Sequence, residues 1–432
     1  MHLSSWGRLY QVETSVSFLD RQNLSLAFAQ PKPCLIRGQG RSYGDVNLTS
    51  DGQTILTDHY RYFHAFDPAT GILECESGVL LKDIQDTFIP QGWMLPVTPG
   101  TQLISVGGAI ANDIHGKNHH IRGNFGHHVV SLQLLRSDLN LVQCSRQENT
   151  ALFFATLGGI GLTGLILRVK IQLLPLQSDL LDVEYLNFRG VSEFINLAKQ
   201  SEPWEYTVSW IDCLSGKNVR GIFMRANHQC LSESKTNIIP LNIKSKKIPF
   251  TPPISCINSL SLKTFNHLYY QINKKPRVIQ QHLYQFQYPL DAIGNWNVLY
   301  GRKGFYQYQC VIPTVDAQTA IEEILDLIYT AQQGSFLVVL KSFGSIKSEG
   351  MLSFPMEGLT LALDFPNLGE KTLNLFEQLD RVVQQAKGRL YLAKDARMSS
   401  DMFFETYLQA EQFKSYRDPA ISSDMSKRLF GY

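Results

Sequence analysis

Hydrophobic and polar positions follow two different patterns along the chain. Up to about residue 178 the apolar runs are short and rich in β-branched residues, which predicts brief strands at 34–38, 53–57 and 129–135. Apolar residues take helical spacing at 81–88 and again at 150–156. This part of the chain is therefore expected to combine short strands, short helices and many connections.

Between about 179 and 388 the predicted elements are longer. Strands are expected at 205–212, 220–226, 304–313, 335–343 and 358–366, with long helices at 317–333 and 370–387. Strands mixed with helices in this order predict an antiparallel sheet with helices packed on one side. The polar stretch 241–255 is expected to be a loop, and a last strand is expected at 389–394, followed by a helical tail.

Length and charge narrow the class of protein. The chain has 432 residues, beyond the size at which a single core usually splits, so two domains are expected. Its 40 basic and 38 acidic residues leave a net charge of +2, and we therefore expect no nucleic-acid partner. Seven scattered cysteines without a CxxC pair predict free thiols in a reducing compartment.

The chain also carries no obvious membrane or export signal. Its first residues lack the apolar core of a signal peptide, and no apolar stretch approaches the roughly 20 residues that a membrane span needs. We expect a cytoplasmic protein, with a peripheral contact at the inner face of the cell membrane left open.

Three glycine-dense segments carry the first chemical signal. The segment 37–45 (RGQGRSYGD) follows a predicted strand, and its glycines would let the backbone approach a ligand closely. Arg37 and Arg41 could add positive charge to such a phosphate-binding turn. The segments 99–120 and 155–164 repeat the theme. Glycine turns also serve packing, but three in one domain favour a long, flat ligand that bears phosphate.

Five histidines lie in or near the second glycine segment, at positions 115, 119, 120, 127 and 128. Neighbouring histidines on extended chain point to opposite faces, and no cysteine or HExxH spacing accompanies them, so we expect no bound metal. His115 and Lys117 are instead expected to supply polar groups beside the flat ligand.

Strand alternation predicts a polar wall in the second part of the chain. Gln307 and Gln309 share one strand face, and Thr360, Ala362 and Asp364 share another. Such faces either line a hydroxyl-rich pocket or simply meet water.

Lys341 and Lys394 end or interrupt apolar runs. Lysines in such positions either extend to the surface or, when they stay buried, take part in catalysis.

Together these segments resemble the FAD domain of the vanillyl-alcohol oxidase superfamily, also called the PCMH type. Within that superfamily, QYPLD (287–291), NWNVLYG (295–301), QYQ (307–309), LSFPMEG (352–358) and YLAKDAR (391–397) resemble the decaprenylphosphoryl-β-D-ribose 2′-oxidase family. The resemblance implies an α+β fold, with a two-subdomain FAD-binding domain at 1–178 and a substrate-binding domain, built on an antiparallel sheet with helices, at 179–388. A C-terminal segment, 389–432, would return to the FAD domain.

The family resemblance also implies an activity. Its members oxidise the 2′-hydroxyl of a polyprenyl-phospho-ribose to a ketone with FAD, as the first half of an epimerisation to arabinose. A separate short-chain reductase would be the partner that completes the epimerisation.

Carried over by matched position, the family's residues fall into three sets. The FAD contacts fall on Arg37, Gly38, Gln39, Gly40, Arg41, Ser42, Tyr43, Gly44, Asp45, Asn47, Gly100, Ser105, Val106, Gly107, Gly108, Asn112, Asp113, His115, Ile166 and Tyr391. The substrate contacts fall on His115, Lys117, Tyr288, Gln307, Gln309, Lys341 and Thr360. The catalytic position falls on Lys394, with His115 and Tyr43 beside it.

Two departures from the family pattern have consequences. Thr360 and Ala362 stand where relatives have asparagine and cysteine, which leaves the exact sugar and lipid open. Arg41 stands where covalent flavoproteins of the superfamily have their flavin-linking histidine, so FAD is expected to bind noncovalently.

Two other functions of the protein remain open at this point, and so do two roles of Lys394. An alditol or aldonolactone oxidase would act on a soluble sugar with oxygen as acceptor, and a flavin-binding scaffold would have no activity. Lys394 would be either a base with a lowered pKa or a cation that stabilises reduced flavin.

Basic and apolar residues are mixed at 244–250 and 274–277. They predict either a weak, salt-sensitive membrane contact or a solvated loop.

Overall fold

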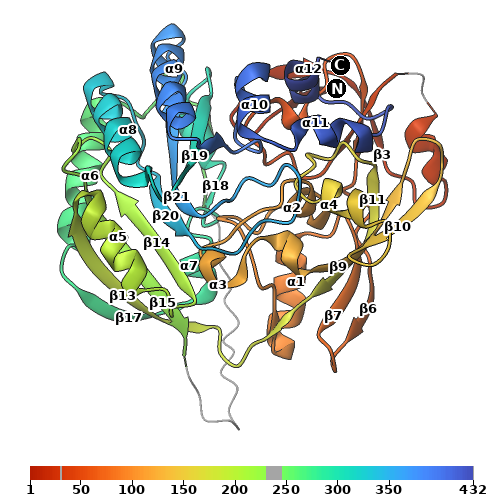
Figure 1. Ribbon diagram of the computed structural model, residues 1–432, viewed down its shortest axis with the longest axis horizontal. Coiled ribbons are helices and arrows are strands. Elements are labelled where there is room, and N and C mark those ends of the chain that lie inside the picture. The colour runs from red at the N-terminus through yellow and green to blue at the C-terminus, as the bar shows by residue number, and fades with distance from the viewer. Residues whose placement is uncertain (30–31, 230–245, 432) are drawn as a thin grey trace.

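The computed structural model describes residues 1–29, 32–229 and 246–431, which form two lobes (Figure 1). The first lobe holds a parallel sheet in the order β3-β5-β4 and an antiparallel sheet in the order β10-β9-β11-β7-β6. The strands of the first sheet are β3 (Ser15–Phe18), β4 (Cys34–Arg37) and β5 (Gln53–Leu56). Those of the second are β6 (Phe63–Asp67), β7 (Ile72–Glu76), β9 (Val129–Leu135), β10 (Leu141–Ser145) and β11 (Leu165–Gln172).

Short helices and strand pairs complete this lobe. The helices are α1 (Leu81–Phe88), α2 (Val106–Ala111), α3 (His119–Arg122) and α4 (Thr150–Thr156). The strand pairs are β1 (His2–Ser4) with β2 (Gln11–Glu13), and β8 (Trp93–Met94) with β12 (Leu174–Pro175). The predicted strands at 34–38, 53–57 and 129–135 and the helices at 81–88 and 150–156 are therefore confirmed.

The second lobe is built on one antiparallel sheet in the order β17-β13-β15-β14-β20-β21-β19-β22. Its strands are β13 (Leu180–Arg189), β14 (Tyr206–Ile211), β15 (Arg220–His228), β17 (Arg277–His282), β19 (Phe305–Pro313), β20 (Val338–Phe343), β21 (Gly358–Pro366) and β22 (Arg389–Leu390). Helices α5 (Gly190–Gln200), α8 (Ala317–Ala331) and α9 (Glu370–Gln385) cover its outer face (Figure 1). The predicted antiparallel sheet with helices is confirmed.

Side-chain alternation explains why the sheet separates a core from a cavity. On β21 the leucines at 359, 361 and 363 are buried against the outer helices. On α8 the buried residues recur at helical spacing, so one apolar stripe meets those leucines. The intervening positions of β21 therefore face the first lobe.

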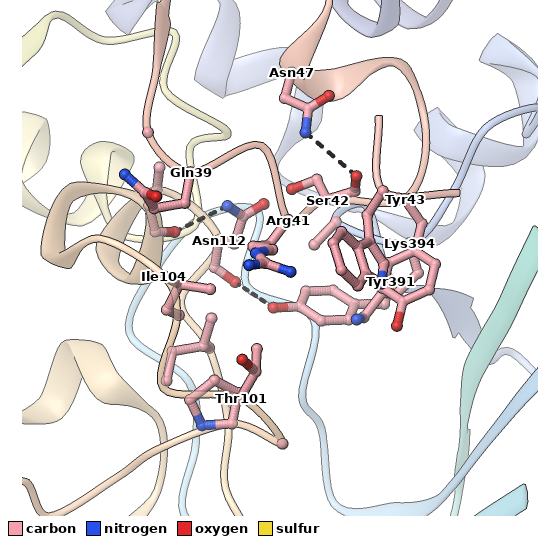
Figure 2. Close-up of a pocket in the computed structure, with 18 of the residues that line it drawn as sticks. Gln39, Arg41, Ser42, Tyr43, Asn47, Thr101, Ile104, Asn112, Tyr391 and Lys394 are labelled. Carbon is pink, nitrogen blue, oxygen red and sulfur yellow. Dashed lines mark hydrogen bonds between the residues drawn. The ribbon is translucent and has the colours of Figure 1, made fainter. Parts of the chain in front are cut away.

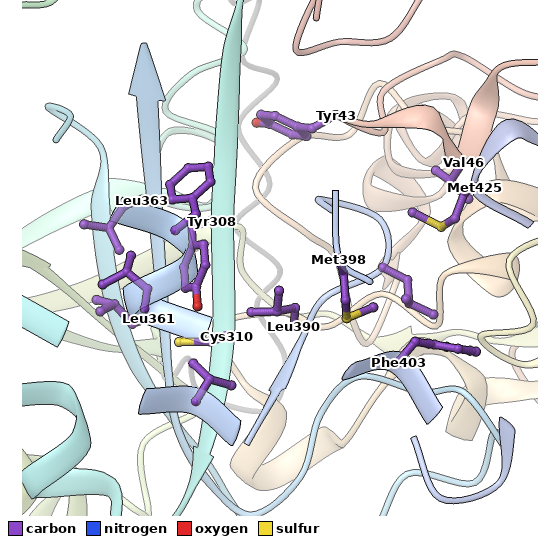
Figure 3. Close-up of a cluster of buried hydrophobic side chains, with 14 of the residues drawn as sticks. Tyr43, Val46, Tyr308, Cys310, Leu361, Leu363, Leu390, Met398, Phe403 and Met425 are labelled. Carbon is purple, nitrogen blue, oxygen red and sulfur yellow. The ribbon is translucent and has the colours of Figure 1, made fainter. Parts of the chain in front are cut away.

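The C-terminal residues join the two lobes. Helices α10 (Ser400–Thr406), α11 (Ala410–Phe413) and α12 (Asp424–Phe430) lie beside the first lobe, and Cys34 of β4 forms a parallel bridge with Ile421. Figure 3 shows the resulting core, in which Tyr43, Leu361 and Met425 belong to one buried apolar cluster.

Two expectations about strands and loops are changed by the structure. The strand predicted at 389–394 stops at Leu390, because the backbone amides of Lys394 and Asp395 bond back to the carbonyl of Tyr391, at 2.9 and 3.0 Å, and close a turn. Within the predicted loop 241–255, β16 (Lys246–Lys247) pairs with β18 (Ile293–Gly294), while 241–245 lie outside the described residues.

Several elements of the second lobe were not predicted, among them the strands β13 and β17 and the helices α5, α6 (Ser259–Asn273) and α7 (Leu283–Gln287). The described part of the chain contains no helix that is long and apolar enough to cross a membrane.

Candidate active site

A cavity of about 370 Å³ lies between the two lobes. The glycine segments of the first lobe form one wall, and the inner face of the large sheet forms the other. The size suits a cofactor or small-molecule site, which usually encloses a few hundred cubic ångströms.

Most of the residues predicted for the site line this cavity. They are Arg37, Gly38, Gln39, Gly40, Arg41, Ser42, Tyr43, Asn47, Gly100, Ser105, Gly107, Gly108, Asn112, His115, Lys117, Ile166, Gln307, Gln309, Lys341, Thr360, Tyr391 and Lys394. The structure thus brings together the three glycine segments, the paired glutamines and the lysines, which lie far apart in the sequence.

Five predicted residues do not line the cavity and lie in the layer behind its lining: Gly44, Asp45, Val106, Asp113 and Tyr288. A Cβ atom added to Gly44 would lie 1.8 Å from the carbonyl oxygen of Asp395, so this glycine permits a close backbone approach. Asp45 pairs with Arg428, at 2.8 Å. Asp113 accepts hydrogen bonds from the amide of Gly126 and from Ser353 Oγ, at 2.8 and 2.5 Å.

The first wall has the features of a cradle for a long polar ligand. Cβ atoms added to Gly100 and Gly161, which line the cavity, would meet nothing within 4 Å, so these backbones face open space. Within the described part of the chain, several buried polar atoms of the lining have no hydrogen-bond partner: Arg37 Nη1, Asn47 Oδ1, Ser77 Oγ, Asn112 Oδ1 and His115 Nδ1. Buried polar groups are normally paired, so these donors and acceptors fit a bound cofactor such as FAD.

Arginine and aromatic rings stiffen the same wall (Figure 2). The guanidinium of Arg41 lies 4.1 Å from the ring centre of Trp6, and burial lowers the pKa of Arg41. Tyr391 donates a hydrogen bond to the carbonyl oxygen of Asn112, at 3.0 Å, and thereby ties the C-terminal turn to the glycine segment.

Three partly buried lysines add positive charge to the cavity. Burial lowers the pKa of Lys117 to about 7, the pKa of Lys341 to about 8 and the pKa of Lys394 to about 7. The charge of Lys341 adds to the lowering at both Lys117 and Lys394. A phosphate oxygen in this cavity would be attracted by each of these amines in its protonated form.

Lys394 lies between an aromatic ring and a buried carboxyl group. Its Nζ is 4.0 Å from the ring centre of Tyr43 (Figure 2). Asp364 raises the pKa of Lys394 against the larger effect of burial, and burial raises the pKa of Asp364 itself to about 7. Asp364 accepts hydrogen bonds from Gln307 Nε2 and from the hydroxyl of Tyr300, at 2.6 and 3.1 Å. Lys394 can therefore exist as the neutral amine near neutral pH.

A series of hydrogen bonds links Thr360 and Gln309 of the sheet wall to His115. Thr360 Oγ1 donates to the carbonyl oxygen of Cys310, at 2.9 Å, and therefore accepts from Gln309 Nε2, at 3.3 Å. The same amide nitrogen lies 3.1 Å from His115 Nε2, which must then accept and leave the ring proton on Nδ1. Burial lowers the pKa of His115 well below its ordinary value, so the ring is neutral and Nδ1 is a free donor.

Sequence reasoning missed several wall residues. Trp6 and Val339 line the cavity although no motif marked them, and Asp291 and Trp296 line it although their motifs were not read as contributing these residues to the site. Asp364 was placed on the correct strand face, but its effect on Lys394 could not be read from the sequence.

Within the described ranges, no group of three or more histidine, cysteine or acidic side chains is arranged to hold a metal ion. The five histidines of the second glycine segment instead bond to the protein or pack against aromatic rings, as His120 does with the carbonyl oxygen of Trp204, at 2.8 Å.

Comparison with known proteins identifies the class first. Residues 22–145 match the family model described as an FAD binding domain. The fold and the cradle agree with this match, and the protein is an FAD-dependent oxidoreductase of the PCMH type.

More extensive similarity identifies the family. The chain is 34% identical to decaprenylphosphoryl-beta-D-ribose oxidase of Mycolicibacterium smegmatis, over 99% of this chain and 97% of that protein. A Streptomyces coelicolor protein, described as an uncharacterized protein in the mprA 5' region, is 26% identical over 81% of this chain and its own full length. L-gulonolactone oxidase of Mus musculus is 30% identical over only 41% of this chain. The chain belongs to the decaprenylphosphoryl-β-D-ribose oxidase family.

Proposed function

We propose that the protein oxidises the 2′-hydroxyl of a polyprenyl-phospho-ribose to a ketone, as the first half of an epimerisation to arabinose. The observation that carries this proposal is the lining of the cavity, which brings Lys117, Lys341 and Lys394 together with the paired glutamines. Cationic groups suit the phosphate, and the glutamines and Thr360 suit sugar hydroxyls.

Oxidation of an alcohol removes a hydride from carbon and a proton from oxygen. FAD would be held by the lining residues of the 37–47 and 100–115 segments together with Ile166 and Tyr391, and when bound it would supply the hydride acceptor. Lys394 accepts the hydroxyl proton, because its lowered pKa leaves much of it neutral near pH 7. Tyr43 holds the ammonium group in place through its ring.

The sugar is positioned by residues of both walls. His115 Nδ1 donates to a ring or hydroxyl oxygen, and the amide of Gln309 fixes that tautomer. Lys117 is held by the carbonyl oxygens of Phe286 and Gln287, and Lys341 by that of Gly116, so both ammonium groups are anchored while facing the cavity. These two lysines bind the phosphate.

The arrangement of the chain and its partners belong to the same proposal. The division into 1–178, 179–388 and 389–432 is supported by the separate sheets and by the bridge from Cys34 to Ile421, while Arg389–Leu390 still pair as β22 with the sheet of the second lobe. A separate short-chain reductase would consume the ketone, and the enzyme would act in the cytoplasm against the inner face of the membrane.

Anaerobic bleaching of the flavin absorbance tests the substrate. A polyprenylphosphoryl ribose should bleach it and yield the 2′-ketone, whereas free alditols and aldonolactones should not. Bleaching by a free aldonolactone alone would replace the proposal with the soluble-sugar oxidase. That alternative has less support, because the lactone oxidases match only about two fifths of this chain.

A further inference from the structure

Helix α6 turns a row of large apolar side chains toward the solvent. Its other side is buried through Leu262, Asn266 and Tyr270. On the outward side Leu260 is 75% exposed, Leu268 55% and Ile272 68%. A helix that meets only water places polar residues there, so a row of this kind marks a surface that binds something.

The stretch of sequence that contains α6 is basic and has no acidic residue. Between 234 and 290 there are eight lysines and arginines and no aspartate or glutamate. The remaining 32 basic and 38 acidic residues give the rest of the chain a net charge of −6. Lys263 lies on α6 itself, and Lys275 and Arg277 follow directly after the helix, all three exposed.

This surface lies beside the cavity. Val208 lines the cavity, and Trp210, two residues along β14 and therefore on the same sheet face, packs on Tyr269 of α6 with ring centres 4.6 Å apart. Phe265 of α6 contacts Phe336, at 4.8 Å, and the next residue of the chain lines the cavity.

We propose that the outward face of α6, with its flanking basic residues, docks on a bilayer surface that contains anionic phospholipid. This inference rests on the proposed function, because a polyprenyl tail stays in the bilayer while the cavity reaches its sugar phosphate. Apolar side chains enter the interface, and the basic residues meet the lipid phosphates. A second copy of the chain fits this surface less well, since pairing two such faces would bring like charges together.

Vesicle co-sedimentation tests the docking. The parent should sediment with vesicles of equal parts phosphatidylcholine and phosphatidylglycerol at low salt, and much less with phosphatidylcholine alone or at high salt. The double variant Leu268→Ser/Ile272→Ser should bind at least about tenfold more weakly. The matched control is Val315→Ser/Leu408→Ser, which removes two side chains that are 93% and 87% exposed elsewhere, and it should bind like the parent.

A second pair of variants tests how much the basic residues contribute to vesicle binding. Lys263→Gln/Lys275→Gln should lower binding about fivefold for each charge at low salt. Lys371→Gln/Arg381→Gln, with two exposed basic residues on α9, is the control and should not. Equal sedimentation of the α6 variants and their controls would overturn the proposal. So would a concentration-dependent dimer that only the α6 substitutions disrupt, because the occupant would then be a second copy.

Failure of the docking can be told apart from failure of the proposed function. The α6 variants should bleach their flavin at the parental rate when the polyprenylphosphoryl ribose is dispersed in detergent, because α6 lies outside the cavity wall. A parent that binds vesicles yet never bleaches would refute the substrate alone. A parent that bleaches normally yet never binds vesicles would refute the docking alone.

Discussion

Replacing Lys394 should remove the proton acceptor while leaving the fold in place. An exposed lysine with a pKa near 10.5 is neutral in only about 3 molecules per 10,000 at pH 7. Burial brings the pKa of Lys394 to about 7, where about half is neutral. Burial therefore raises the fraction of Lys394 that is neutral at pH 7 about a thousandfold. This factor lies within the acceleration that a general base usually gives, about 10²–10⁴.

Stopped-flow measurement of anaerobic flavin reduction, at saturating polyprenylphosphoryl ribose, gives the test. The Lys394→Ala variant should reduce its flavin about 10²–10⁴ times more slowly and should keep the parental FAD content. Lys394→Arg separates the two roles, because arginine keeps the charge and cannot act as a base near pH 7. If Lys394→Arg reduces its flavin at nearly the parental rate, the residue stabilises charge and the base assignment is wrong.

The rate of flavin reduction should also depend on pH in a definite direction. The neutral amine gains population as pH rises, so the parental rate should rise about tenfold per unit below pH 7 and level off above it. Asp364 raises the pKa of Lys394, so Asp364→Asn should move the profile toward lower pH. A profile that moves toward higher pH would contradict the coupling between the two residues.

Three further predictions concern the cofactor and the fold. Acid precipitation should release all FAD into the supernatant, since Arg41 replaces the flavin-linking histidine; yellow colour in the pellet would contradict this. Gly100→Trp, which fills open space at the cradle, should purify with little flavin by its absorbance ratio while its circular dichroism stays parental. Arg428→Ala removes the ion-pair partner of two buried carboxylates and should destabilise the protein by about 3–5 kcal/mol, seen as a lower melting temperature. Arg381→Ala, at an exposed position of α9, should not.

Elements with one strong period could be predicted from the sequence. The strand β9 and the helix α4 match their predicted ranges because their apolar spacing is local information. The helix α6 was missed because apolar residues lie on both its buried and its solvent side, which blurs the helical period. In the structure the helix begins after Asn258, whose side-chain oxygen accepts hydrogen bonds from the amides of Leu260 and Ser261, both at 3.1 Å.

The site illustrates what sequence pattern cannot supply. The glycine segments and the lysines could be named, because their residue types carry the chemistry. Had 389–394 been a strand throughout, Lys394 would share a face with Leu390 and Leu392, and both leucines are buried in the main core. The turn closed on the carbonyl of Tyr391 breaks that alternation and places the lysine on the cavity wall. There Asp364, thirty residues earlier, influences its pKa, so the property that suits Lys394 for catalysis arises only from the tertiary fold.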